Sequence, residues 1–276
     1  GHSPYSHALE RLIIDADHEA IGKMIMLQFA KTLGSQLDLA YDMFTGKYHR
    51  PFFHQLISGQ LDLDRLDYLS RDSFYTGVAE GVVGHDRILR MLRVVDNKLV
   101  VEEKGLYSIE KFLVARRIMY WQVYLHKTAL AAELMAKAVI RLLREQDAGE
   151  RAGYLAPELE FFLSKKVKIQ DFRDHPDELL AIFSDLDDIS VDYSIKRLQD
   201  HFYTPLSFLT TNLFHRKLHK LRWSDEPLED EMINDIRKKC QEKYGWSPEI
   251  ADKMIWLGSE TKADYIREDD EINILM

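Results

Sequence analysis

The spacing of apolar and polar residues from Ser58 to Gly77 predicts an amphipathic helix with one strongly polar side. At about 100° per residue, that side carries Asp64, Tyr68, Arg71, Asp72 and Tyr75, with Arg65 at its edge. The apolar side carries Leu63, Leu66, Leu69 and Phe74. A solvated helix stabilised by Asp–Arg pairs four residues apart would show the same pattern, so periodicity alone leaves a structural and a functional interpretation open.

The same kind of pattern predicts a mostly helical chain. Before the central helix, we expect helices from Pro4 or Ser6 to Leu12, from Asp17 to Phe29 and on both sides of a loop centred on Gly46. After it, we expect helices over residues 86–92, 107–143, 157–164, 176–183, 190–221 and 229–244. Residues 107–143 contain no Gly or Pro and predict one rod of ~55 Å. Alternation around Asp96 and Asn97 predicts a β-hairpin, and residues 254–257 and 272–275 predict short strands.

Composition narrows the class of protein. Lysine and arginine number 37 against 46 aspartates and glutamates, which gives a net charge of −9. This balance argues against general nucleic-acid or membrane-surface binding, because both use broad positive fields. Cys240 is the single cysteine, so no disulfide framework is expected. No apolar run approaches the ~20 residues that span a bilayer, and we expect a cytoplasmic protein.

The order of residue types in the central helix is more specific evidence than its apolar periodicity. From Asp62 to Asp72 the chain reads D-x-D-R-x-D-Y-x-x-R-D. This string resembles the second conserved block of HD-domain phosphohydrolases, in particular the deoxynucleoside triphosphate (dNTP) triphosphohydrolases that include the SAM-and-HD-domain enzyme and bacterial dGTPases. The resemblance implies that Asp64 is the last ligand of a metal site and that its neighbours contact a nucleotide.

The first residues resemble another block of that family. The string S-P-Y-S-H, which ends at His7, matches H-D-x-G-H-x-P-x-S-H entered after its His-Asp pair. We therefore expect a chain truncated at its N-terminus, which lacks the other metal ligands of the family and has little hydrolase activity by itself. Imidazole and carboxylate ligands suit a divalent metal ion without distinguishing Mg, Mn, Fe, Co or Zn.

The resemblance also implies catalytic residues near the N-terminus. It assigns such roles to His2, His7, Glu10 and His18, with His7 and His18 as candidate general acids and Glu10 orienting its histidine. A histidine near a helix start is, taken alone, more often a capping or surface residue. Three histidines at the family spacing favour the catalytic interpretation.

A later helix resembles the family pattern R-(x)7-Y-x-H-K. Arg116, Tyr124, His126 and Lys127 match it, and Tyr120 stands where the SAM-and-HD-domain enzyme has a histidine. The resemblance implies that Arg65, Arg116 and Lys127 contact phosphates, that Tyr68 and Tyr124 flank the sugar, with Tyr120 nearer the base, and that Asp72 accepts a hydrogen bond from the sugar 3′-hydroxyl. An aromatic stripe packed into the core is the structural alternative. Asp67 and Arg71 are expected to form a structural pair.

Together these observations predict a mostly α protein. Residues 1–145 would form an HD-domain helical core with a short β-hairpin, and residues 146–276 a helical region with a few strands. The implied function is metal-dependent hydrolysis of dNTPs to deoxynucleoside and triphosphate. Hydrolysis of another phosphoester, such as a nucleoside monophosphate, and a catalytically inactive nucleotide-binding scaffold remain alternatives. Family members assemble, so we expect a homo-oligomer, and the apolar helices after residue 146 are one possible interface.

Overall fold

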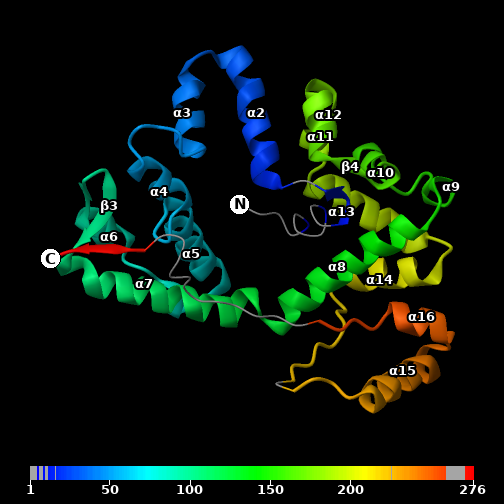
Figure 1. Ribbon diagram of the computed structural model, residues 1–276. Helices are drawn as coiled ribbons and strands as arrows, with labels where there is room; N and C mark the ends of the chain where they lie inside the picture. The colour runs from blue at the N-terminus through cyan, green and yellow to red at the C-terminus, as the bar shows by residue number, and fades with distance from the viewer. Residues whose placement is uncertain (1–4, 6–8, 10–11, 16, 225, 259–270) are drawn as a thin grey trace. The chain divides into compact units, whose positions relative to one another are not determined.

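Helices make up most of the chain in the computed structural model, which confirms the predicted fold class (Figure 1). The structure describes residues 5, 9, 12–15, 17–224, 226–258 and 271–276. Contacts group the described residues into two units. One unit comprises residues 22–126 with the C-terminal segment, and the other comprises the earlier N-terminal residues with the chain from Lys127 to 258. The predicted domain boundary after residue 145 is a different division and stays a prediction.

The first unit contains the central helix α5 (Leu63–Thr76). Its other elements are α2 (His18–Leu33, from Gly22 on), α3 (Gln36–Phe44), α4 (Phe52–Ser58), η1 (Ala79–Gly81), α6 (His85–Met91), β2 (Leu92–Val95), β3 (Lys98–Glu102), η2 (Glu103–Gly105), α7 (Leu106–Met119), η3 (Tyr120–Tyr124) and β5 (Asn273–Leu275). Asp62 caps α5 because its Oδ1 accepts a hydrogen bond from the Arg65 backbone N–H at 2.7 Å. Gly77 ends α5 in the left-handed conformation, with φ 73°.

The predicted hairpin is confirmed. Strands β2 and β3 pair antiparallel, with Val95 opposite Lys98. Asp96 and Asn97 both have positive φ, 49° and 60°, as a two-residue type I′ turn requires. The strand predicted near residues 272–275 is also confirmed, because β5 pairs in parallel with β3 and forms a sheet of order β2-β3-β5.

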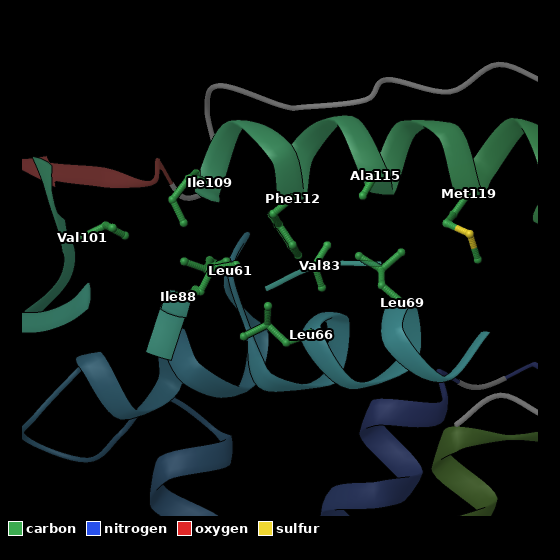
Figure 2. Packing of buried hydrophobic residues seen from close by; sticks show 10 residues of the cluster. All are labelled: Leu61, Leu66, Leu69, Val83, Ile88, Val101, Ile109, Phe112, Ala115 and Met119. Carbon is green, nitrogen blue, oxygen red and sulfur yellow. The ribbon is translucent and has the colours of Figure 1, made fainter. Parts of the chain in front are cut away.

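The core of this unit lies between α5 and α7 (Figure 2). From α5, Leu66 and Leu69 are buried at the spacing that places them on one helix face. From α7, the buried residues are Ile109, Phe112, Ala115 and Met119. Leu61, Val83, Ile88 and Val101 complete the cluster. Because each helix is apolar on one side, burying these sides against each other leaves the polar side of α5 available for the site.

The prediction of one rod over residues 107–143 is wrong. The α-helical pattern ends at Met119, and residues Tyr120–Tyr124 form a π-helical turn, in which the Leu125 N–H donates to the Tyr120 carbonyl at 2.7 Å. The next helix, α8 (Lys127–Glu145), begins after this break. No Gly or Pro marks the break, so tertiary packing overrides local helix propensity here.

The second unit is built around α8. Its other elements are β1 (Ile14–Asp15), α9 (Ala148–Arg151), α10 (Pro157–Ser164), β4 (Val167–Lys168), α11 (Ile169–Asp174), α12 (Pro176–Asp185), α13 (Asp188–Arg197), η4 (Leu198–Asp200), α14 (Thr204–Phe214), α15 (Asp230–Tyr244) and α16 (Pro248–Lys253). The helices expected at 157–164, 176–183 and 229–244 are confirmed. The short parallel pair β1–β4 was not predicted, because two-residue strands carry no periodicity.

Two further predictions in this unit are wrong. Residues 190–221 do not form one helix. The buried His201 donates from Nε2 to the Glu150 carbonyl and accepts at Nδ1 from the Tyr203 N–H, and these bonds hold a turn between η4 and α14. Residues 254–257 are a turn and irregular chain rather than a strand, and Trp256 instead donates to the Lys253 carbonyl at 3.0 Å. Within the described residues, no helix has the length and apolar character needed to cross a membrane.

Gly81 allows close packing between η1 and the core. A Cβ at this position would lie 2.9 Å from Ser73 Cβ and 2.8 Å from Met119 Cγ, both on buried residues. We expect Gly81→Ala to lower the free energy of unfolding by about 1–3 kcal/mol through overpacking. Gly84→Ala is the matched control, because a Cβ there meets no atom within 4 Å. Urea denaturation measures both variants, and equal midpoints would contradict the expectation.

Candidate functional site

The polar side of α5 meets the π-helical turn at one hydrogen bond. The Tyr124 hydroxyl donates to Asp72 Oδ2 at 2.6 Å, across 52 residues of sequence. The Tyr124 ring contacts Tyr68 and Tyr120 edge to face, with ring centroids 6.1 and 5.0 Å apart. We call Tyr68, Asp72, Tyr120 and Tyr124 the tyrosine–aspartate cluster. All four side chains are partly buried, so each keeps part of its surface exposed.

Electrostatics keep Tyr124 a hydrogen-bond donor. Burial, followed by the hydrogen bond and the negative charge of Asp72, raises the pKa of Tyr124 far above its ordinary value. Burial also raises the pKa of Tyr68, although the positive charges of Arg116 and Arg65 oppose this shift. Both hydroxyls therefore stay protonated at neutral pH. The cluster contains one carboxylate as its acceptor and neutral phenols around it.

Arg116 lies near this cluster on α7. Its Nη1 donates to Gln60 Oε1 at 3.0 Å, and Gln60 belongs to the loop between α4 and α5. This bond orients the guanidinium through a residue 56 positions earlier in the chain. The sequence analysis did not identify Gln60, because a single glutamine in a loop carries no motif or periodicity.

Arg65 is anchored at the start of α5. Its guanidinium donates to the Gly59 carbonyl and to the carboxylate of Asp62. Asp62 is only 4% exposed. Burial raises the pKa of its carboxyl, although the hydrogen bond from the Arg65 backbone N–H and the positive charge of Arg65 oppose this shift. The pair holds Arg65 close enough for its charge to act on Tyr68, as that of Arg116 does. Two cationic groups thus act on Tyr68.

Asp64 and Asp67 have different surroundings on α5. Asp67 forms an ion pair with Arg71 at 3.0 Å on the surface, which confirms the predicted structural pair. Asp64 is exposed in the first turn. Among the residues that the structure describes, no three or more His, Cys, Asp or Glu side chains gather in a group that would hold a metal ion. Asp64 therefore supplies a single carboxylate, which does not make a metal site by itself.

Other predicted site residues belong to the second unit or lie outside the described residues. His2, His7 and Glu10 lie outside the described residues. His18 is exposed at the start of α2, with its Nδ1 3.5 Å from Asp17 Oδ1. Lys127 is exposed at the start of α8. The first unit thus assembles Arg65, Tyr68, Asp72, Arg116, Tyr120 and Tyr124, and the roles assigned to the remaining residues stay predictions.

Comparisons with known proteins point to one family. A model of the HD associated region matches residues 83–156. A solved phosphohydrolase from Bacteroides thetaiotaomicron VPI-5482 is similar along almost the whole chain, with a TM-score of 0.91 and 40% sequence identity. That similarity covers 99% of this chain and 68% of the solved one.

Curated relatives are longer than the present chain. The uncharacterised protein YwfO of Bacillus subtilis is 34% identical over 153 residues, which are 52% of this chain and 35% of that protein. The deoxynucleoside triphosphate triphosphohydrolase SAMHD1 homolog of Dictyostelium discoideum is 26% identical over 154 residues, 49% of this chain and 30% of that protein. The matches span about a third of these two relatives' own length.

The bond between Tyr124 and Asp72 makes a testable contribution to stability. In a double-mutant cycle of Tyr124→Phe and Asp72→Ala, we expect a coupling free energy of about 1.5 kcal/mol, because the acceptor is charged. Tyr68→Phe with Asp72→Ala is the control cycle, since the Tyr68 hydroxyl does not bond Asp72 in the structure, and its effects should add. Chemical denaturation gives the free energies. Additive effects in both cycles would contradict the bond.

Proposed function

The chain belongs to the HD-domain phosphohydrolase family, and from this premise we propose that it contributes the nucleotide-binding face of a dNTP triphosphohydrolase. The observation that carries the proposal is that Tyr68 contacts the ring of Tyr124, whose hydroxyl bonds the Asp72 carboxylate, and that the positive charge of Arg116 also acts on Tyr68. A deoxynucleotide presents a sugar hydroxyl and a chain of phosphates along one molecule. The name of the Dictyostelium relative supports the same substrate class.

The phosphates would bind at Arg65 and Arg116. Arg116 and Arg65 carry planar guanidinium groups whose forked N–H donors suit phosphate oxygens. Gln60 accepts a hydrogen bond from Nη1 of Arg116, and Gly59 with Asp62 accepts from Nη1 of Arg65, so neighbouring residues orient both guanidinium groups. Lys127 is proposed as an additional phosphate contact.

The sugar would bind at the tyrosine–aspartate cluster. Asp72 Oδ2 accepts a hydrogen bond from the Tyr124 hydroxyl. The second oxygen of the carboxylate would accept a hydrogen bond from the 3′-hydroxyl of the sugar. Tyr68 and Tyr124 would contact the sugar from either side, and Tyr120 would lie toward the base. A tyrosine ring against C2′ would disfavour a ribose, because its 2′-hydroxyl would be buried without a partner.

In the proposed reaction, water attacks the α-phosphorus and the bond from that phosphorus to the 5′-oxygen breaks. The products are a deoxynucleoside, whose 5′-oxygen takes up a proton, and triphosphate. His7 and His18 are proposed as proton donors, with Glu10 orienting one of them and His2 in a supporting catalytic role. Arg65 and Arg116 would stabilise the charge that develops on the phosphoryl oxygens.

A divalent metal ion is part of the proposal, because HD phosphohydrolases generally use one. Asp64 is proposed as one of its ligands, and the ion would supply Lewis-acid polarisation of a phosphoryl oxygen. The described residues do not complete such a site. The contribution that this face makes to binding therefore rests on the two arginines and the tyrosine–aspartate cluster.

The test is a product screen of the full-length protein against dNTPs, NTPs and nucleoside monophosphates, each with Mg, Mn, Co and Fe. We expect dNTPs to give the deoxynucleoside and triphosphate, identified by mass. In ¹⁸O-labelled water, the label should enter triphosphate, because attack occurs at phosphorus. Release of a monophosphate with diphosphate, or turnover of monophosphates alone, would overturn the proposed substrate class.

Two aspartates on α5 provide a matched pair for the metal assignment. In the full-length protein, we expect Asp64→Ala to remove bound metal and turnover, whereas Asp67→Ala keeps both and loses at most about 1 kcal/mol of stability with its surface ion pair. Elemental analysis gives the metal content and thermal melting gives the stability. Equal metal content in wild type and Asp64→Ala would refute the assignment.

Tyr124 should contribute to selection of the sugar. We expect Tyr124→Ala to lower the ratio of kcat/KM for dGTP over GTP by about tenfold to a hundredfold, the cost of a buried hydroxyl without a partner. Tyr75→Ala is the control, because Tyr75 is exposed on the same side of α5 and should leave the ratio unchanged. A ratio that is unchanged in Tyr124→Ala, with activity still measurable, would assign Tyr124 to packing alone.

A further inference from the structure

Both arginines of the proposed phosphate site are held by one short turn, residues 59–62, which joins α4 to α5. The guanidinium of Arg65 donates to the Gly59 carbonyl. The guanidinium of Arg116 donates to Gln60 Oε1 at 3.0 Å. We call residues 59–62 the arginine-holding turn. Because the turn carries acceptors for both guanidinium groups, a movement of the turn displaces both acceptors together.

The last residue of the arginine-holding turn, Asp62, interacts with both arginines. Its buried carboxylate accepts a hydrogen bond from the Arg65 guanidinium. Burial raises the pKa of this carboxyl, and the positive charges of Arg65 and Arg116 oppose the shift. A hydrogen-bonded carboxylate that attracts both cations adds to the two bonds made by the other residues of the turn. The turn therefore orients the two arginines as a pair.

Gln55 on α4 connects the arginine-holding turn to the sheet. Its main-chain carbonyl accepts a hydrogen bond from the Gly59 N–H at 3.0 Å. Its side-chain Oε1 accepts a hydrogen bond from the Leu99 N–H at 2.8 Å, across 44 residues of sequence. Leu99 belongs to β3, the central strand of the sheet β2-β3-β5. One residue thus bonds both the start of the turn and the strand that β5 completes.

Residues 271–276 border the turn at one end and belong to the sheet at the other. Glu271 and Ile272 line a small cavity together with residues 59–61 and Gln55. The residues that follow form β5, which pairs in parallel with β3. The segment therefore meets the two structures that Gln55 joins.

Apolar packing fixes this segment against the turn. Side chains alternate along an extended chain, so Ile272 and Ile274 share one face and Leu275 lies on the other. Both isoleucines pack against the core cluster, which contains Leu61 (Figure 2). Leu61 is itself part of the arginine-holding turn and is buried. Leu275 is 40% exposed, so the isoleucine face is the one that supports the turn.

We propose that residues 271–276 are a positioning element for the two arginines, because they hold the arginine-holding turn in place and the turn orients Arg65 and Arg116 toward phosphates. The inference rests on the proposed function, which gives the two guanidinium groups their ligand. A guanidinium is a planar fork that binds two phosphate oxygens in a defined orientation. A misplacement of about 1 Å is able to lower catalysis roughly a hundredfold, so a segment that touches no phosphate still affects turnover.

Hydrogen exchange tests the first step without any ligand. In the full-length protein, we expect Ile272→Ser to raise amide exchange in residues 55–66 by at least about fivefold, because weaker packing lets the turn open locally. Leu275→Ser is the matched control and should leave this exchange unchanged, since Leu275 is exposed. Exchange in α8 reports on general unfolding. An unchanged rate in residues 55–66, or an equal rise in α8, would overturn the proposal.

Binding of inorganic triphosphate tests the second step. In calorimetry on the full-length protein at one fixed metal concentration, Gln60→Ala and Ile272→Ser should each weaken binding by about threefold to tenfold. Gln36→Ala, exposed on α3, is the control. In an Arg116→Ala background, Gln60→Ala should have no further effect, because it acts through Arg116. An equal loss in both backgrounds would overturn the positioning role.

Combining the two variants tests whether they act through the same turn. Gln60→Ala with Ile272→Ser should weaken triphosphate binding by less than the product of the two single effects, because both changes release the same guanidinium. Effects that multiply in full would contradict the proposal. Failure of the proposed function is recognised separately, since a wild type that binds no triphosphate contradicts the phosphate contacts themselves. Triphosphate binding that neither variant changes would contradict the positioning element alone.

Discussion

The packing of α5 against α7 is the interaction on which the site depends. Burying a side chain such as Leu69 or Phe112 contributes roughly 1.5–3 kcal/mol, whereas a neutral hydrogen bond contributes about 0.5–1.5 kcal/mol. The apolar contact therefore decides how the two helices meet, and the polar contacts follow from it. Asp72 on α5 reaches Tyr124 on η3, and Gln60 before α5 reaches Arg116 on α7, because the Leu face of α5 and the Phe face of α7 are already buried together.

Local sequence signals were sufficient to predict the central helix and the β-hairpin. The central helix combines an apolar repeat with a capping Asp62 and a terminating Gly77, and the hairpin combines alternation with two residues that accept positive φ. The resemblance of the motifs supplied the residues of α5 and η3 that the structure brings into the tyrosine–aspartate cluster. These predictions concern short stretches of chain, in which every determinant lies within a few residues.

The features that could not be predicted depend on contacts between distant residues. The π-helical turn at Tyr120–Tyr124 lies in a stretch whose composition favours an unbroken helix, so the sequence offered no reason to interrupt it. The hydrogen bond between Gln60 and Arg116 joins residues 56 positions apart, and the sequence around either residue does not predict the other as its partner. Only the packed structure specifies such pairs, because the partner is chosen by the folded geometry rather than by neighbouring sequence.

The pairing of β5 with β3 has a consequence for the order of synthesis. Strand β3 and its hairpin partner leave the ribosome early, but the strand that completes their sheet is made only after all of α8 to α16. Until then, one edge of β3 exposes unpaired backbone N–H and C=O groups, which are able to pair with any other extended chain. The nascent protein therefore passes through a stage in which this edge needs protection, and mispairing there is the hazard that its topology creates.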